Sequence, residues 1–230
     1  MRGLQSGIYA IVDGDRLGLA TRTDKRPPIN VIRAYAEAAA DAGAAAVQIR
    51  LKHLPLGHPT RLTALNAVRR ALGGRIPVIA DDDLQAALSA HVGLHVGQDD
   101  GDPRLARQRL DAGALVGWST HSLAQVRAAQ ALPVDYLGFG PVQPTDGKQT
   151  RDAVTGFEVL ADAVAASHLP IVAIGGLRSE DVARVRRTGA YAMAVIGAWL
   201  GPVGRPHDAV TAGAQLAALS AAWARASETR

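Results

Sequence analysis

Charged and amide side chains occupy the positions where buried strands are expected to end. Gln48, Arg50 and Lys52 close one apolar run at alternating positions, and alternation along a strand places them on one face. Asp81 ends the next apolar run, and Asp100 follows the one after that. Fixed cations beside two carboxylates suit a diphosphate bound together with magnesium. The spacing therefore predicts an anion and metal site at one rim of the fold.

The two carboxylates are the candidate metal ligands. Asp81 and Asp100 follow neighbouring strands, which lie about 4.8 Å apart, so they can share one Mg2+ and leave room for substrate phosphates. Asp82 and Asp83 are interpreted instead as capping residues of the next helix. Lys148, in a loop rich in proline and glycine, adds a third cation.

Several polar residues at strand ends allow more than one interpretation. Gln48 lies within an apolar run, where its amide needs either a structural hydrogen bond or a ligand. Ser119, Thr120 and His121 lack the surrounding sequence of a nucleophilic triad, so we expect polar contacts to a substrate ring, with His121 able to move a proton. His95 is expected to be a hydrogen-bonded core residue.

A second anion site is expected on the last two strands. Gly175 and Gly176 follow the seventh apolar run, and Ile196, Gly197 and Ala198 follow the eighth. In many barrels the loops at these places bind a phosphate through backbone N–H groups. The sequence therefore predicts two anion sites in one molecule.

Alternating elements must position these residues. We expect strands at 7–12, 44–50, 77–80, 93–97, 115–119, 136–140, 171–175 and 191–196. Helices are expected at 31–42, 60–72, 83–90, 103–112, 122–131, 156–167, 179–188 and 207–226. Continuously apolar strands are typical of a parallel sheet covered by helices.

Eight strand-and-helix units predict a single (β/α)8 TIM barrel over 1–230, with the barrel core at about 7–200 and a final helix and tail at 201–230. The competing open doubly wound sheet would carry a glycine-rich phosphate loop after its first strand. That position reads Asp13-Gly14-Asp15-Arg16 instead. Residues 16–30 are expected to form a loop or lid.

Composition limits the classes of protein. The chain has 230 residues, a formal charge of +4 and no cysteine, which excludes disulfides and thiolate metal sites. Arginines are dispersed without interleaved aromatics, so nucleic acid is not expected as a partner. With no signal peptide or membrane span evident, we expect a cytoplasmic protein with small-molecule substrates and no membrane partner. Its oligomeric state is left open.

The ordered motifs resemble those of thiamine-phosphate synthases. The motifs are QIRLK at 48–52, LHVGQDD at 94–100, WSTHS at 118–122, LGFGPV at 137–142, PT at 144–145 with Lys148, and AIGG at 173–176. The resemblance implies that hydroxymethylpyrimidine diphosphate is joined to thiazole phosphate, with release of diphosphate. Loss of diphosphate before attack would need cations and Mg2+ to stabilise the departing charge.

The resemblance also implies roles for individual residues. On the pyrimidine side it implies ring contacts from Gln48 and Ser119, diphosphate contacts from Arg50, Lys52 and Lys148, and Mg2+ on Asp81 and Asp100. On the other side it implies contacts to the thiazole phosphate from Thr145 and the Gly176 amide, within loops that also hold Gly175, Ile196 and Gly197. The expected catalytic residues are Arg50, Lys52, Ser119 and Lys148.

The chain departs from the family pattern at some positions. Ala80 stands where Asn is usual, Gly147 where Thr is usual and Gly197 where Ser is usual, while Gln143 adds a polar side chain. Lost bonds to charged groups at about 1.5–3 kcal/mol each would slow a synthase. Two alternatives therefore stay open: a thiazole tautomerase that uses His121, and a barrel that only binds a thiamine precursor.

Overall fold

The strands form a closed parallel barrel in chain order. The computed structural model describes residues 3–19, 28–145, 153–203 and 205–227. Strand β1 pairs with β2 and the series continues to β8, which returns to pair with β1. The strands are β1 Gly7–Asp13, β2 Ala46–Arg50, β3 Val78–Asp81, β4 Gly93–Val96, β5 Val116–Thr120, β6 Tyr136–Phe139, β7 Ile171–Ala173 and β8 Ala192–Val195. The predicted TIM barrel is confirmed.

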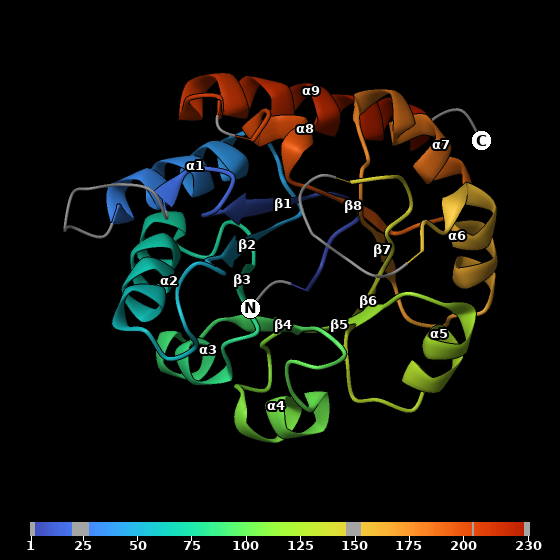
Figure 1. Cartoon of the computed structure of the whole chain (residues 1–230), viewed down its shortest axis with the longest axis horizontal. Coiled ribbons are helices and arrows are strands. Elements are labelled where there is room, and N and C mark those ends of the chain that lie inside the picture. Colours follow the sequence, from blue (N-terminus) through green and yellow to red (C-terminus); the bar gives the residue numbers. More distant parts are fainter. Residues whose placement is uncertain (1–2, 20–27, 146–152, 204, 228–230) are drawn as a thin grey trace.

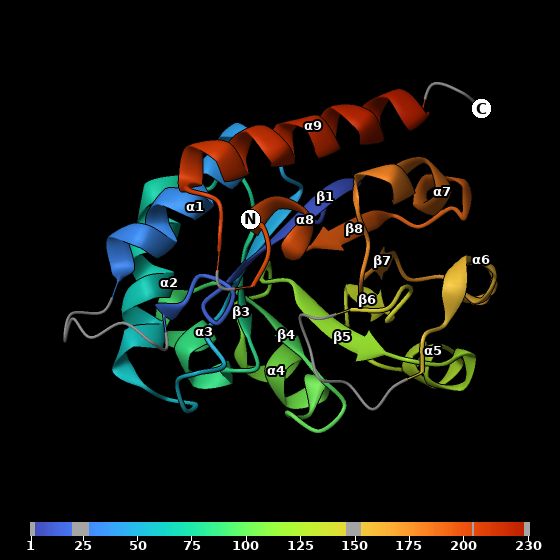
Figure 2. The same ribbon diagram turned by 45° about the horizontal axis from the view of Figure 1, so that its top comes forward.

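Helices surround the barrel on its outside (Figure 1). They are α1 Ile29–Asp41, α2 Pro59–Leu72, α3 Leu84–Ala90, α4 Pro103–Arg109, α5 Leu123–Ala129, α6 Gly156–Ala165, α7 Val182–Arg187, α8 Gly197–Leu200 and α9 Ala209–Ser227, with a 3-10 turn η2 at Ser179–Asp181. Figure 2 shows the long α9 lying across α1 and α7, the helices that flank the closing strands. None of the described helices combines the length and hydropathy that a membrane span requires.

Alternation along each strand divides the apolar residues into two layers. Ile49 and Ala80 belong to the large layer between strands and helices. Tyr9, Ile79 and Tyr136 belong to the smaller cluster inside the barrel. Both layers are buried, which is why the strands read as continuously apolar in sequence. The inward residues at the ends of the strands are therefore those free to form a site.

Most helix boundaries agree with the sequence pattern, and the differences have local causes. Asp83 caps α3 by accepting a hydrogen bond from Ala86 N at 2.9 Å, as predicted. Helix α2 begins at Pro59, one residue before the expected start, and His58 caps it by accepting a hydrogen bond from Thr60 N at 3.2 Å. The short α8 was not predicted, because its four residues are too few to show a helical period.

Candidate active site

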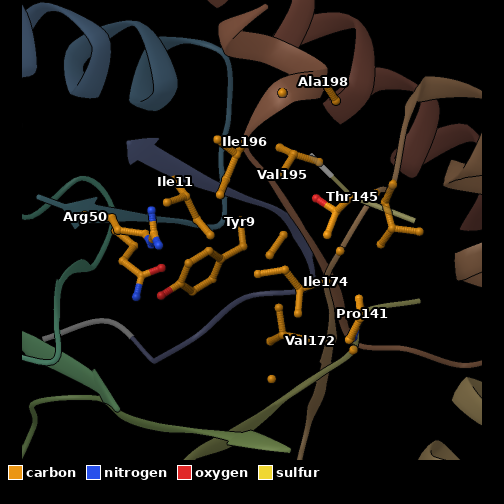
Figure 3. A pocket seen from close by; sticks show the side chains of 18 of the residues that line it. Tyr9, Ile11, Arg50, Pro141, Thr145, Val172, Ile174, Val195, Ile196 and Ala198 are labelled. Carbon is orange, nitrogen blue, oxygen red and sulfur yellow. The ribbon is translucent and has the colours of Figure 1, made fainter. Parts of the chain in front are cut away.

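A cavity opens at the carboxyl ends of the strands, where barrels place their sites. Its volume is about 850 Å3, and Tyr9, Ile11, Val172 and Ile174 form an apolar wall at its base (Figure 3). Charged side chains from the ends of β2 and β3 line one side, and backbone-rich loops after β6, β7 and β8 line the other. The site therefore has a charged side and a glycine-rich side.

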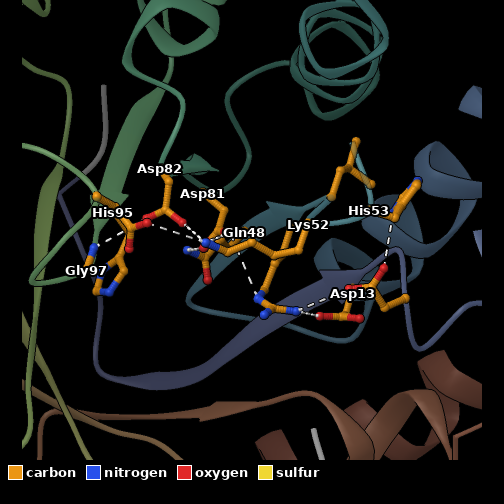
Figure 4. A network of polar contacts seen from close by, with 12 residues as sticks. Asp13, Gln48, Lys52, His53, Asp81, Asp82, His95 and Gly97 are labelled. Carbon is orange, nitrogen blue, oxygen red and sulfur yellow. Dashed lines mark hydrogen bonds and ion pairs between the residues drawn. The ribbon is translucent and has the colours of Figure 1, made fainter. Parts of the chain in front are cut away.

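Arg50 and Lys52 carry the positive charge on the first side, and Figure 4 shows Lys52 beside Asp81 and Asp82. Arg50 forms an ion pair with Asp13 and lies 3.9 Å from the Asp81 carboxylate. The Lys52 ammonium forms an ion pair with Asp82 and lies 3.8 Å from Asp81. The predicted cations therefore lie together at the rim, each held by acidic side chains.

Asp81 is the most perturbed acid of this cluster. Its carboxyl is 7% exposed and accepts a hydrogen bond from Gln48 Nε2 at 3.2 Å. Burial, and next the negative charge of Asp82, raise the pKa of Asp81 to about 7, although Arg50 and Lys52 oppose that shift. Its Oδ2 atom accepts no hydrogen bond from the described residues. A buried oxygen that accepts no hydrogen bond is available to a cation or to a hydrogen-bond donor of a ligand.

The acidic residues fit the predicted magnesium. The Lys52 ammonium lies 3.8 Å from both Asp81 Oδ2 and Asp100 Oδ1, so the two predicted ligands face one point. Among the residues that the structure describes, no three acidic or histidine side chains form a complete metal cage. Mg2+ needs only one or two carboxylates when substrate phosphates supply further oxygens. The donor set therefore suits a metal that arrives with a diphosphate.

The interpretation of Asp82 as a helix-capping residue is wrong. Asp82 has a backbone φ of 60°, which turns its side chain back over the site instead of along α3. Its carboxylate pairs with Lys52 and accepts a hydrogen bond from the Gly97 amide at 3.3 Å. Asp83 alone caps the helix. The different roles of Asp82 and Asp83 could not be predicted from three consecutive aspartates, because a sequence pattern does not show which residue adopts a left-handed conformation.

Ala80 does not face the substrate site. It is 1% exposed and packs in the layer between strands and helices, while its neighbour Asp81 points inward. Ala80 is not among the described residues that line the cavity, so a longer side chain there would start from the layer between strands and helices. The expected loss of a substrate contact at this position stays a prediction. Asp82 supplies a polar group at the rim instead.

Ser119 and His121 line the cavity beside the charged cluster. Ser119 Oγ lies 2.9 Å from His95 Nε2, and His121 Nδ1 lies 2.6 Å from the Gly140 carbonyl oxygen. Thr120 is fully buried and donates to the Gly138 carbonyl. His95 is hydrogen-bonded as predicted, but it is half-buried and lines the cavity rather than the core.

The glycine-rich side brings together the residues predicted for a phosphate. Thr145, Gly175, Gly176, Ile196 and Gly197 all line the same cavity. Figure 3 shows Thr145 and Ile196 on the side of the cavity away from Arg50. The described residues of both predicted anion sites thus line one cavity.

The loop after β7 depends on glycine. Gly175 and Gly176 have φ values of 98° and 67°. A Cβ on Gly176 would overlap the Pro144 carbonyl oxygen and lie 2.7 Å from that of Gln143. The loop after β7 can therefore lie against the loop after β6 only because position 176 has no side chain.

Arg16 is a further cation that sequence reasoning missed. Its side chain is 5% exposed, lines the cavity and donates to the Gly201 carbonyl at 3.1 Å. A Cβ on Gly197 would lie 3.1 Å from the Arg16 guanidinium, so the absent side chain leaves room for it. The residue belonged to a segment predicted as a loop or lid, of which 20–27 lie outside the described residues.

Comparison with known proteins decides the family. The model of the family described as thiamine monophosphate synthase matches residues 21–199, more than half of the chain. The chain belongs to the thiamine monophosphate synthase family. Members of this family that are named thiamine-phosphate synthase are transferases, and this chain is an enzyme of that transferase family.

Named synthases align over most of the chain. A thiamine-phosphate synthase of Anaeromyxobacter dehalogenans is 39% identical over 204 residues, which cover 87% of this chain and 83% of that protein. One from Chlamydia caviae is 34% identical, with 82% and 89% covered. The thiamine biosynthesis bifunctional protein ThiED of Geobacter sulfurreducens is 46% identical over 71% of this chain, which spans only 33% of that longer protein.

A solved structure supports the same family. The thiamine phosphate pyrophosphorylase of Pyrococcus furiosus superposes with a TM-score of 0.74 at 27% identity and covers 95% of this chain and 96% of that one. The synthase-family cavity thus contains every predicted substrate residue among the described residues. Lys148, and Gly147 beside it, lie outside them.

Proposed function

We propose that this protein joins hydroxymethylpyrimidine diphosphate to a thiazole phosphate, giving thiamine phosphate and diphosphate. The observation that carries the proposal is the single cavity with cations on one side and a glycine-rich backbone on the other. A volume of about 850 Å3 lies in the range of small-molecule sites. Two phosphorylated substrates can therefore meet with their reacting ends over the apolar base.

Arg50 and Lys52 would hold the diphosphate and stabilise it as it leaves. Negative charge on a leaving diphosphate grows in the transition state, so a fixed guanidinium and ammonium stabilise that state more than the bound substrate. Asp13 and Asp82 orient these two cations in the free protein. Lys148 would be a third cation for the diphosphate, and only the family resemblance supports this role.

Magnesium is part of the proposal. Asp81 and Asp100 would hold the ion, and substrate phosphates would supply further oxygens. The ion would supply further positive charge to the departing diphosphate. In the free protein Lys52 contacts the same carboxylates, so its ammonium can turn toward the diphosphate when that substrate arrives with its metal.

The pyrimidine and the bond-forming carbon would lie over the base of the cavity. Gln48 and Ser119 offer hydrogen bonds to the ring, while Ile11, Val172 and Ile174 exclude water. A carbocation formed by loss of diphosphate survives only where water cannot reach it. No protein nucleophile is required, which agrees with the rejection of a triad.

The thiazole phosphate would bind on the glycine-rich side. Thr145 offers a hydroxyl, Gly176 and Gly197 offer backbone N–H groups, and Arg16 brings a positive charge next to Gly197. The guanidinium lies where a family serine side chain would otherwise point, so it can replace a lost hydroxyl contact with a charged one.

The tautomerase alternative rests on His121, which lines the cavity. That reaction needs one phosphate site and a proton carrier, and it would leave Arg50, Lys52 and the carboxylates paired with them without a task. The synthase uses all of them. A cytoplasmic location belongs to the proposal as well, because both substrates are charged phosphates that do not cross membranes unaided.

Release of diphosphate tests the proposal. Diphosphate should appear only when both substrates and Mg2+ are present, and excess chelator should stop its release until Mg2+ is restored. A tautomerase would instead convert the thiazole phosphate alone. A protein that only binds would give neither product, and either result would refute the synthase function.

A further inference from the structure

Four hydrogen-bonding groups lie in a row across the barrel interior. The hydroxyl oxygens of Tyr9 and Tyr136 lie 3.0 Å apart. The Tyr136 hydroxyl lies 3.1 Å from His95 Nδ1, and His95 Nε2 lies 2.9 Å from Ser119 Oγ. The row runs from Tyr9 on β1 to Ser119 on β5, and all four residues line the cavity.

The surrounding backbone leaves room for this row. A Cβ on Gly117 would overlap both the Tyr136 ring and His95, and one on Gly138 would lie 3.2 Å from His95 Cε1. The rings of His95 and Tyr136 stack at 5.5 Å with an interplanar angle of 24°. Gly117 and Gly138 therefore allow the imidazole and the phenol to occupy the barrel centre in fixed orientations.

Burial keeps the two phenols in their neutral form. Tyr9 is 2% exposed and Tyr136 is 1% exposed. Burial, followed by the neighbouring phenol for Tyr9, raises the pKa of both side chains above the ordinary value. Each hydroxyl thus keeps one proton to donate and can accept one hydrogen bond.

The hydrogen bond of Tyr9 determines which group donates and which accepts at each step of the row. Among the described residues, Tyr136 is the hydrogen-bond partner of the Tyr9 hydroxyl. If Tyr9 donates to Tyr136, the Tyr136 proton goes to His95 Nδ1, and the imidazole then carries its proton on Nε2. The opposite order would turn the Tyr9 O–H away from Tyr136, and among the described residues no other acceptor lies within hydrogen-bond distance of it, so that order costs free energy.

We propose that Tyr9, Tyr136 and His95 are positioning residues that fix the donor direction of Ser119. His95 Nε2–H donates to Ser119 Oγ, so the serine proton points into the cavity at a hydrogen-bond acceptor. The ligand selected is an aminopyrimidine that presents an unprotonated ring nitrogen, and a ring with N–H at that place is rejected. This inference rests on the proposed contact between Ser119 and the pyrimidine.

The tautomer of His95 can be measured without any substrate. Histidine labelled with 15N in the whole protein should show His95 protonated on Nε2 and unprotonated on Nδ1, with the signal assigned by its loss in His95→Gln. Tyr136→Phe should shift the Nδ1 resonance. A proton on Nδ1 with Nε2 unprotonated in the wild type would overturn the inference even if the protein is a synthase.

Kinetics separate positioning from a structural effect. Tyr136→Phe should raise the KM for the pyrimidine diphosphate about three- to tenfold, the equivalent of one neutral hydrogen bond, and leave the KM for the thiazole phosphate unchanged. Tyr191→Phe is the matched control, because its hydroxyl donates to the Leu4 carbonyl at 3.0 Å, outside the row. An equal rise in both KM values, or the same rise in the control, would overturn the inference.

A double substitution tests whether His95 acts through Ser119. In a Ser119→Ala background, His95→Gln should cause no further rise in the KM for the pyrimidine diphosphate. A further rise of the same size as in the wild type would show that His95 acts on substrate independently of Ser119. If Tyr136→Phe does not fold, Tyr9→Phe provides the same test from the buried end of the row.

Discussion

The Lys52 ammonium is paired with the Asp82 carboxylate, a residue that the backbone turns back over the site through a φ of 60°. The same ammonium lies 3.8 Å from the Asp100 carboxylate on the next strand loop. Lys52 thus joins the acidic groups of two loops in the free protein. In the proposed function, this cation would exchange carboxylate contacts for contacts with the diphosphate.

Lys52→Met should mainly lower kcat. The charge that the ammonium meets grows as diphosphate leaves, so its removal costs more in the transition state than in the bound substrate. We expect a loss of roughly 100-fold in kcat, which corresponds to about 2.7 kcal/mol. Arg75→Gln, which breaks an exposed ion pair with Asp41, is the control and should leave the steady-state constants unchanged. A rise in KM with kcat intact would contradict a role in the transition state.

The pKa of Asp81 predicts a pH dependence of stability. Burial and the charge of Asp82 raise its pKa to about 7 from the ordinary value of 3.8, so between these pH values the folded state holds a proton that the unfolded state releases. Asp81 should therefore add to the free energy of unfolding below about pH 4. This contribution should be lost as the pH rises from about 4 to about 7. Asp81→Asn should remove this component of the slope. Urea denaturation at several pH values measures it, and an unchanged slope in the variant would contradict the assignment.

Ala80→Asn should weaken the fold without improving the enzyme. Position 80 is buried between barrel and helices, where an amide without partners costs about 1–3 kcal/mol. We expect a matching loss in the free energy of unfolding and no gain in kcat/KM. A higher kcat/KM would show that position 80 does face the substrates.

Gly176→Ala should impair the thiazole phosphate site. The new Cβ would overlap the Pro144 carbonyl, and the φ of 67° adds backbone strain. The KM for the thiazole phosphate should rise about tenfold or more, while the KM for the pyrimidine diphosphate changes little. Gly43→Ala is a close control, since it has a φ of 75° with no atom within 4 Å of its Cβ. Equal effects of the two variants would point to strain alone.

The barrel and most of the site followed from sequence patterns for a physical reason. Parallel strands buried on both faces are continuously apolar, and the polar residue that ends each run marks the rim, as Arg50 and Asp81 do. Asp82 and Arg16 were missed because their placement depends on a left-handed residue and on a turn that folds back to α8. The sequence also does not show which face of the sheet Ala80 occupies, because a shift of one residue in the pairing of β3 would move its side chain to the other face.

A crystal structure with Mg2+, an unreactive pyrimidine diphosphate analogue and thiazole phosphate tests the central claim most directly. The diphosphate should lie against Arg50 and Lys52, with the metal on Asp81 and Asp100. The thiazole phosphate should lie on the opposite side, within hydrogen-bond distance of the Gly176 amide and beside Arg16. A diphosphate on the glycine-rich side, or a thiazole phosphate seated on Arg50 and Lys52, would contradict it.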